Sequence, residues 1–166
     1  VIQTADAVAI GSADITSLAA IATLTTGAVA ALTTDQVRGV ALSTAQSVGL
    51  GTVQVVALTT AQFVALTSTQ IGVLTSTQVG VIEADDAVAI GAADIGSLPT
   101  IERLSTGAVS ALGTAQVRGL GTAQVEALTT AQFVALTSAQ FLALSSSQVA
   151  VIQTADVVAI GSTDIT

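Results

Sequence analysis

Six aspartates are the residues of this sequence that could do metal chemistry, because they recur as pairs spaced eight residues apart. Carboxylates are hard oxygen ligands, and Ca²⁺ takes roughly six to eight oxygens in proteins. The pairs occur three times along the chain, which makes their members weak candidates for calcium ligands: Asp6, Asp14, Asp86, Asp94, Asp156 and Asp164.

The surroundings of these aspartates favour a different interpretation. A calcium loop draws its ligands from a short run of Asp, Asn and Gly, whereas apolar residues fill most of the space between these carboxylates. Each Asp also stands where other parts of the chain carry Gln, close to a predicted helix start at which negative charge is stabilising. We therefore expect the aspartates to serve helix capping, and we predict no metal site.

Composition excludes several other kinds of chemistry. The chain has no His, Cys or Lys, so the usual activated nucleophiles and zinc ligand sets are missing. We predict no catalytic residue, no cofactor and no enzymatic activity. With three arginines and a net charge of −8, the chain also lacks the basic patch that nucleic acid requires.

The long uncharged stretch from residue 39 to residue 82 is apolar enough to raise the question of a membrane span. Thr, Ser or Gln interrupts it every few residues. No run of about 18 apolar residues results, which is the length a spanning helix needs. We predict no transmembrane segment.

The aspartates belong to a repeat of eight residues that runs through the chain. Three copies stand side by side in residues 58–81, LTTAQFVALTSTQIGVLTSTQVGV. The pattern is [LI]-[TSG]-[TS]-x-[QD]-[VIF]-x-[small], and we number its positions 1 to 8. Two units of six residues, starting at Leu18 and Leu98, and one of ten residues, starting at Leu32, depart from it.

This octad is a helix-start signal. With the N-cap at position 2, Gln at position 5 falls at N3 and completes a Ser/Thr-x-x-Gln capping box. The apolar residues at positions 1 and 6 are then the partners of a hydrophobic staple. Leu58, Thr59, Gln62 and Phe63 form one such set. The sequence therefore predicts a new helix every eight residues.

Helices this short are marginal alone, because nucleation is costly. Their stability must come from stacking, which would bury positions 1 and 6 with the small residue at position 8 and leave the variable position 7 exposed. We predict an all-α solenoid of very short capped helices. A β-solenoid is the alternative, since Val, Thr and Ile favour strands; the lack of strict polar–apolar alternation speaks against it.

A longer repeat is superimposed on the octads. Ile at position 1 and Asp at position 5 occur together in paired units, and each pair opens a block. The blocks are 2–81, 82–151 and the start of a third, 152–166, with no linker between them. We predict a single continuous repeat array over residues 1–166. Because residues 151–166 nearly repeat residues 1–16, we expect the chain to be a segment of a longer array.

The repeated L-T-x-x-Q-V phrase resembles the alanine- and threonine-rich tandem repeats of very large bacterial secreted or cell-surface proteins. The resemblance implies an extended spacer, stalk or filament subunit, extracellular or on the cell surface, with no enzymatic residues. We also expect end-to-end self-association into filaments. The alternative is a binding scaffold or adhesin that presents rows of Thr and Gln to carbohydrate, ice or a protein partner.

Overall fold

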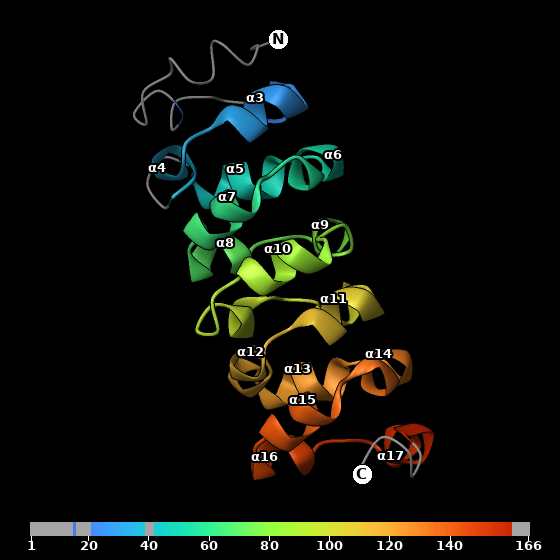
Figure 1. Ribbon diagram of the computed structural model, residues 1–166. Helices are drawn as coiled ribbons and strands as arrows, with labels where there is room; N and C mark the ends of the chain where they lie inside the picture. Colours follow the sequence, from blue (N-terminus) through green and yellow to red (C-terminus); the bar gives the residue numbers. More distant parts are fainter. Residues whose placement is uncertain (1–14, 16–20, 39–41, 161–166) are drawn as a thin grey trace.

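The computed structural model describes Ile15 and residues 21–38 and 42–160. This part of the chain forms an elongated stack of short helices that descends from α3 to α17 (Figure 1). No β-strand occurs among the described residues. The predicted all-α solenoid is therefore confirmed, and the β-solenoid alternative is wrong.

The helices form three stacks. Consecutive helices along the chain belong to the first, second and third stack in turn, so each helix contacts the one three places earlier. The first stack contains η1 (Ile21–Thr23), α5 (Thr44–Gly49), α8 (Ser68–Gly72), η2 (Ile95–Ser97), α12 (Thr114–Gly119) and α15 (Ser138–Ala143). The second contains α3 (Thr26–Ala31), α6 (Thr52–Val56), α9 (Ser76–Val79), η3 (Ile101–Arg103), α13 (Thr122–Ala127) and α16 (Ser146–Val149). The third contains α4 (Thr34–Val37), α7 (Thr60–Ala65), α10 (Ala84–Ala89), α11 (Thr106–Ala111), α14 (Thr130–Ala135) and α17 (Thr154–Ile160).

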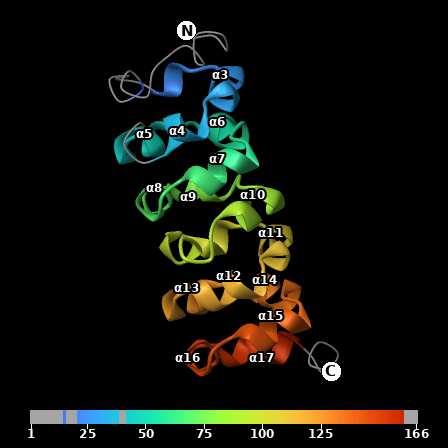
Figure 2. The same ribbon diagram turned by 60° about the vertical axis from the view of Figure 1, so that its left-hand side comes forward.

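Three successive units therefore make one coil of the solenoid. In the regular part the chain returns to the same stack after 24 residues, as between Leu112 and Leu136. Figure 2 shows the same layered arrangement from another side. The predicted block boundary at residue 82 falls between α9 and α10, and the opening of the first block lies outside the described residues.

Each α-helix begins where the octad predicts. Position 2 is the N-cap with extended backbone, and position 3 is the first helical residue. At α7 the Thr59 hydroxyl accepts from the Gln62 backbone N–H at 3.3 Å, and the Gln62 side-chain oxygen accepts from the Thr59 N–H at 2.7 Å. Where position 2 is Gly, as at Gly51, the Gln oxygen still takes the backbone N–H, here at 2.8 Å. The predicted capping box is confirmed.

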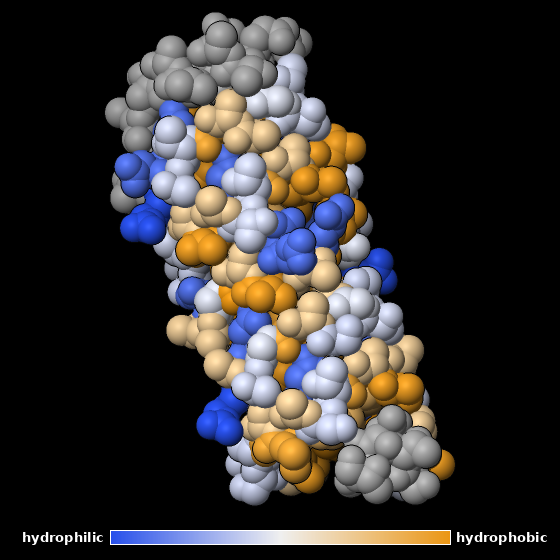
Figure 3. Space-filling view, in the orientation of Figure 1, coloured by the Kyte–Doolittle hydropathy of each residue, from blue (hydrophilic) through white to orange (hydrophobic). Residues whose placement is uncertain are grey.

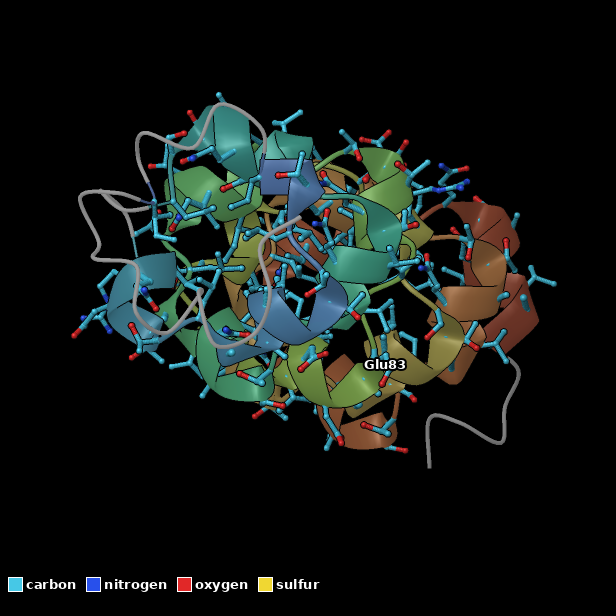
Figure 4. All side chains as sticks on the ribbon, turned by 90° about the horizontal axis from the view of Figure 1, so that it is seen from above. Glu83 is labelled. Carbon is cyan, nitrogen blue, oxygen red and sulfur yellow. The ribbon has the colours of Figure 1, made fainter. Side chains whose placement is uncertain are left out.

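The core consists chiefly of positions 1 and 6, as predicted. Phe63 and Phe133 at position 6 are among the largest fully buried side chains. Seen from above, side chains fill the space enclosed by the helices (Figure 4). Position 7 is exposed at Val64 and Arg118, also as predicted. Position 8 is mostly exposed or half-buried, so the prediction that it joins the core was wrong for most units.

The two six-residue units form 3₁₀-helices in place of α-helices: the first contains η1 and the second contains η3. Two fewer residues leave no room for a full α-helical turn with its cap, and a 3₁₀-helix spans more length per residue. The octad that starts at Ile90 also forms a 3₁₀-helix, η2. Among the described residues no helix is long and apolar enough to cross a membrane.

Candidate functional site

The glutamine at position 5 is the polar group that recurs inside the stack. Gln62 is almost fully buried, with 1% of its surface exposed. Its oxygen caps its own helix, and its nitrogen donates to the backbone carbonyls of Val29 at 2.8 Å and Leu32 at 2.7 Å. Both carbonyls lie at the end of α3, one coil earlier. A single amide thus caps the start of one helix and the end of another.

We call this arrangement a glutamine bridge: the side-chain nitrogen at position 5 donates to two carbonyls of the preceding coil. The acceptors are the position 6 residue four units earlier and the position 1 residue three units earlier; where the earlier unit has six residues, its fourth residue, Ile21 or Ile101, takes the place of position 6. Nine glutamines make both bonds within the described residues: Gln54, Gln62, Gln70, Gln78, Gln116, Gln124, Gln132, Gln140 and Gln148. Gln46 bonds the Ile15 carbonyl in the same manner.

The chemistry of these bridges explains why position 5 is Gln and never Glu in these units. A carboxylate accepts but does not donate, so Glu would cap its own helix and face the two carbonyls with a negative charge. A buried polar group left without its partner costs about 1–3 kcal/mol. The amide satisfies both sets of backbone groups without a buried charge.

The octad pattern predicts the capping role of these glutamines but not their bridges between coils. A signal was present, because Glu caps a helix N-terminus as well as Gln and suits the helix dipole better. The absence of Glu at position 5 indicates a need for a donor. The bridges also correct the alternative in which rows of Gln face a ligand, since these side chains are turned inward.

Two of the candidate calcium ligands are buried at position 5 of the third stack. The Asp86 carboxylate accepts a hydrogen bond from the Thr60 hydroxyl at 3.1 Å, and Asp156 accepts one from Thr130 at 2.7 Å. Each hydroxyl belongs to a helix of an earlier coil in the same stack, α7 for Asp86 and α14 for Asp156. Neither aspartate donates to the preceding coil, as a glutamine would.

Burial raises the pKa of Asp86 above its ordinary value, because desolvation penalises the carboxylate. The hydrogen bond from Thr60 works in the opposite direction, and the nearby negative charges of Glu83 and Asp85 add to the increase. Glu83, labelled in Figure 4, is the N-cap residue of α10, and its side chain makes no capping hydrogen bond. The start of α10 is thus an acidic and weakly capped helix end.

The remaining aspartate candidates do not join this pair. Asp94 precedes η2 in the first stack, and its carboxylate lies close to Gly91. Asp6, Asp14 and Asp164 lie outside the described residues. Within the described part of the chain, no three His, Cys, Asp or Glu residues are grouped so that they could hold a metal ion. The absence of a calcium site stays a prediction, which calcium titration can test.

The Ser and Thr residues at position 3 lie on the outside of the solenoid, although the Thr60 and Thr130 hydroxyls donate to Asp86 and Asp156. Each α-helix begins with this residue except α10, which begins with Ala84. All of these Ser and Thr residues in the described chain are exposed. The face in Figure 3 mixes polar and apolar residues, with no large continuous patch of either kind.

Three stacks of short capped helices joined by buried amides define an α-solenoid of tandem repeats. The family model of the ALTTAQ repeat matches residues 40–68, 56–82, 87–130, 101–138 and 122–151. These matches cover more than half of the chain, so the chain belongs to the ALTTAQ repeat family. No curated protein and no solved structure is significantly similar to it. The predicted LTxxQ-type tandem repeat is confirmed.

Proposed function

We propose that this chain is a structural segment, a spacer, stalk or filament subunit of a bacterial extracellular or cell-surface protein, without catalytic activity. The observation that carries the proposal is the ladder of glutamine bridges. It uses the recurring buried polar side chain of the octad to join one coil to the next. A chain whose recurring polar side chain serves to bond successive coils to one another is suited to spanning a distance.

The experiment addresses location and length separately. Antibodies raised against the chain should label intact cells of the source organism in immunogold microscopy. Labelling only after the cells are made permeable would contradict the surface location. Deleting residues 112–135, three whole octads, should shorten the particle in small-angle X-ray scattering and keep its helical circular dichroism. Deleting residues 112–131 breaks the octad frame and should abolish cooperative melting.

Self-association is the second part of the proposal. In the last described coil, Val149 and Val157 at position 6 are 52% and 53% exposed, whereas Val79 and Val125 at the same position are 0% exposed. A further coil of the same repeat, from this chain or from a second copy, fits this apolar surface. A head-to-tail contact of this kind propagates into a filament unless it closes.

Sedimentation velocity over a wide concentration range tests this association. Added salt should promote it by screening the net charge of −8. Val157→Lys should suppress it, whereas Val64→Lys, which changes an exposed valine in the middle of the stack, should not. A single monomeric species at all concentrations and salt levels would contradict the association.

A binding scaffold is the second candidate, and the exposed position 3 hydroxyls favour it. They begin helices in all three stacks and could face carbohydrate, ice or a protein partner. A glycan array probed with the labelled chain tests the carbohydrate case. Binding that survives removal of these hydroxyls, as in Thr114→Val with Thr122→Val, would argue against recognition by these rows.

A further inference from the structure

One stretch of the described solenoid has no glutamine bridges. Position 5 is Asp86 in α10 and Asp94 before η2, the shortened unit of η3 lacks the octad Gln, and position 5 is Ala108 in α11. Residues 42–160 are described throughout, and within them these are four consecutive units without a bridge. Bridges resume directly on both sides, at Gln78 and at Gln116. We call the contact between these four units and the preceding coil the seam.

The backbone carbonyls of the preceding coil also show that the bridges are missing at the seam. The Leu50 carbonyl accepts from Gln78 at 2.8 Å, and the Leu112 carbonyl accepts from Gln140 at 2.7 Å. The corresponding carbonyls at the seam belong to Leu58, Leu66, Leu74 and Ile82, and no side-chain amide of the described chain donates to them. The ends of α6, α7, α8 and α9 are therefore not bonded to the next coil by a glutamine as other helix ends are.

Little polar contact replaces the bridges. Thr60 donates to Asp86, a single side-chain bond in which the buried acceptor is a carboxylate. The Thr100 hydroxyl, at the N-cap of η3, is the one buried side-chain polar atom of the described chain without a hydrogen-bond partner. A buried hydroxyl without a partner weakens the folded state.

The consequence follows from the one-dimensional character of a solenoid. Its stability is approximately a sum of units and neighbouring interfaces, so it opens where an interface is weakest. We propose that the seam is a joint, at which the stack opens locally while the coils on both sides remain folded. This inference does not depend on the proposed surface function. It assigns a mechanical role to the longer repeat, because the seam coincides with the opening of the second block.

The joint also responds to pH. Asp86 faces Glu83 and Asp85 on its own helix, and the two helices packed against α10, α7 and α11, carry no charged residue. Because burial raises the pKa of Asp86, protonation is easier in the closed joint than in the open one. The joint is therefore weakest at neutral pH and tightens as the pH falls through the raised pKa.

Native-state hydrogen exchange of the whole chain tests the proposal. In a uniform solenoid the ends fray and the middle is protected best. If the seam is a joint, the amides at the seam should be less protected than those nearer the C-terminal end of the stack. The amides of Ala87 in α10 and of its C-cap residue Ile90 should exchange faster than those of Val117 in α12 and of its C-cap residue Leu120, by about tenfold or more after correction for intrinsic rates. Equal or greater protection at α10 would overturn the proposal.

A pair of variants of identical composition isolates the missing bridge. Glu83→Thr with Asp86→Gln rebuilds the capping box and places an amide opposite the Val55 and Leu58 carbonyls. Glu83→Thr with Asp85→Gln makes the same changes of type, but its Gln falls on an exposed position. The first variant should slow exchange at Ala87 and Ile90 by about tenfold relative to the second and remove its pH dependence. Equal exchange in both variants would show that the missing bridge does not create the joint.

Discussion

The coil of α12, α13 and α14 and the stretch of α10, η2 and η3 use the same three stacks and are held in different ways. In the first, Gln116, Gln124 and Gln132 each bridge to two carbonyls of the coil before. In the second, no such bridge is made, and α10 keeps one side-chain bond to the coil before, from Thr60 to Asp86. The comparison shows that the shape of the solenoid does not require a bridge in every unit.

Glycines lie where the backbones of η2 and α12 approach each other closely. A Cβ on Gly96 of η2 would lie 2.8 Å from the Gly119 carbonyl oxygen, and one on Gly119 would overlap the Ala92 carbonyl just before η2. On the other side of η2 and η3, a Cβ on Gly72 or Gly80 would meet the Ser97 or Arg103 oxygen only at ordinary contact distance, 3.5 and 3.7 Å. Glycine therefore gives room on the side of η2 where the Gln116 and Gln124 bridges also lie.

The largest effect should come from breaking a bridge in the regular coil. Gln132→Glu keeps the capping oxygen and replaces the donor to the Ile101 and Leu104 carbonyls by a buried carboxylate. We expect a loss of about 3 kcal/mol or more at neutral pH, measured by urea unfolding. Gln153→Glu makes the same change at an exposed position and is the control. Equal stability of the two variants would mean that the bridge contributes nothing.

The next effect should come from the close packing of η2. Gly119→Ala forces a methyl group against the Ala92 backbone carbonyl, which has no rotamer to move aside. We expect a loss of about 1–3 kcal/mol, the usual range for overpacking. Gly107→Ala is the matched control, because its nearest neighbour is the Ser105 hydroxyl at 3.7 Å. Thermal melting of both variants should separate them, and similar midpoints would contradict the close approach.

A smaller effect should be a pH-dependent change in melting temperature that arises at the aspartate unit of α10 and not at the glutamine units. Asp86→Asn removes a carboxylate whose pKa is raised in the folded chain. The wild type pays for ionising this group above its folded pKa, and the penalty disappears as the pH falls through that value. The variant should therefore melt higher than the wild type by about 1–2 °C at pH 7, and the difference should shrink near pH 4. A difference that grows in acid would contradict the assigned direction.

The sequence predicts the local structure well, because the capping box, the staple and the stacked core are written within one octad. Thr59, Gln62 and Phe63 are close in sequence, and their roles follow from their spacing. The glutamine bridge depends on a partner about 30 residues away, as for Gln62 and Leu32. The sequence of one octad does not specify which other unit packs against it in the folded chain. Neither the three stacks nor the bridges could therefore be predicted. The role of the glycines at the 3₁₀-helices was hidden for the same reason.

The smallest effect should be that of calcium, which tests whether the aspartate units differ from the glutamine units in ligand chemistry or only in packing. The Asp86 and Asp156 carboxylates are each bound by a Thr hydroxyl, and α11 and α14 lie between their helices in the third stack. A ligand that binds only the folded state must raise its melting temperature. We expect calcium at millimolar concentration to raise the melting temperature no more than magnesium at equal ionic strength, because both ions screen the net charge of −8 to the same degree. A rise of many degrees with calcium alone would restore the aspartates as ligands. Repeating the titration with Asp86→Asn would then show whether this carboxylate takes part.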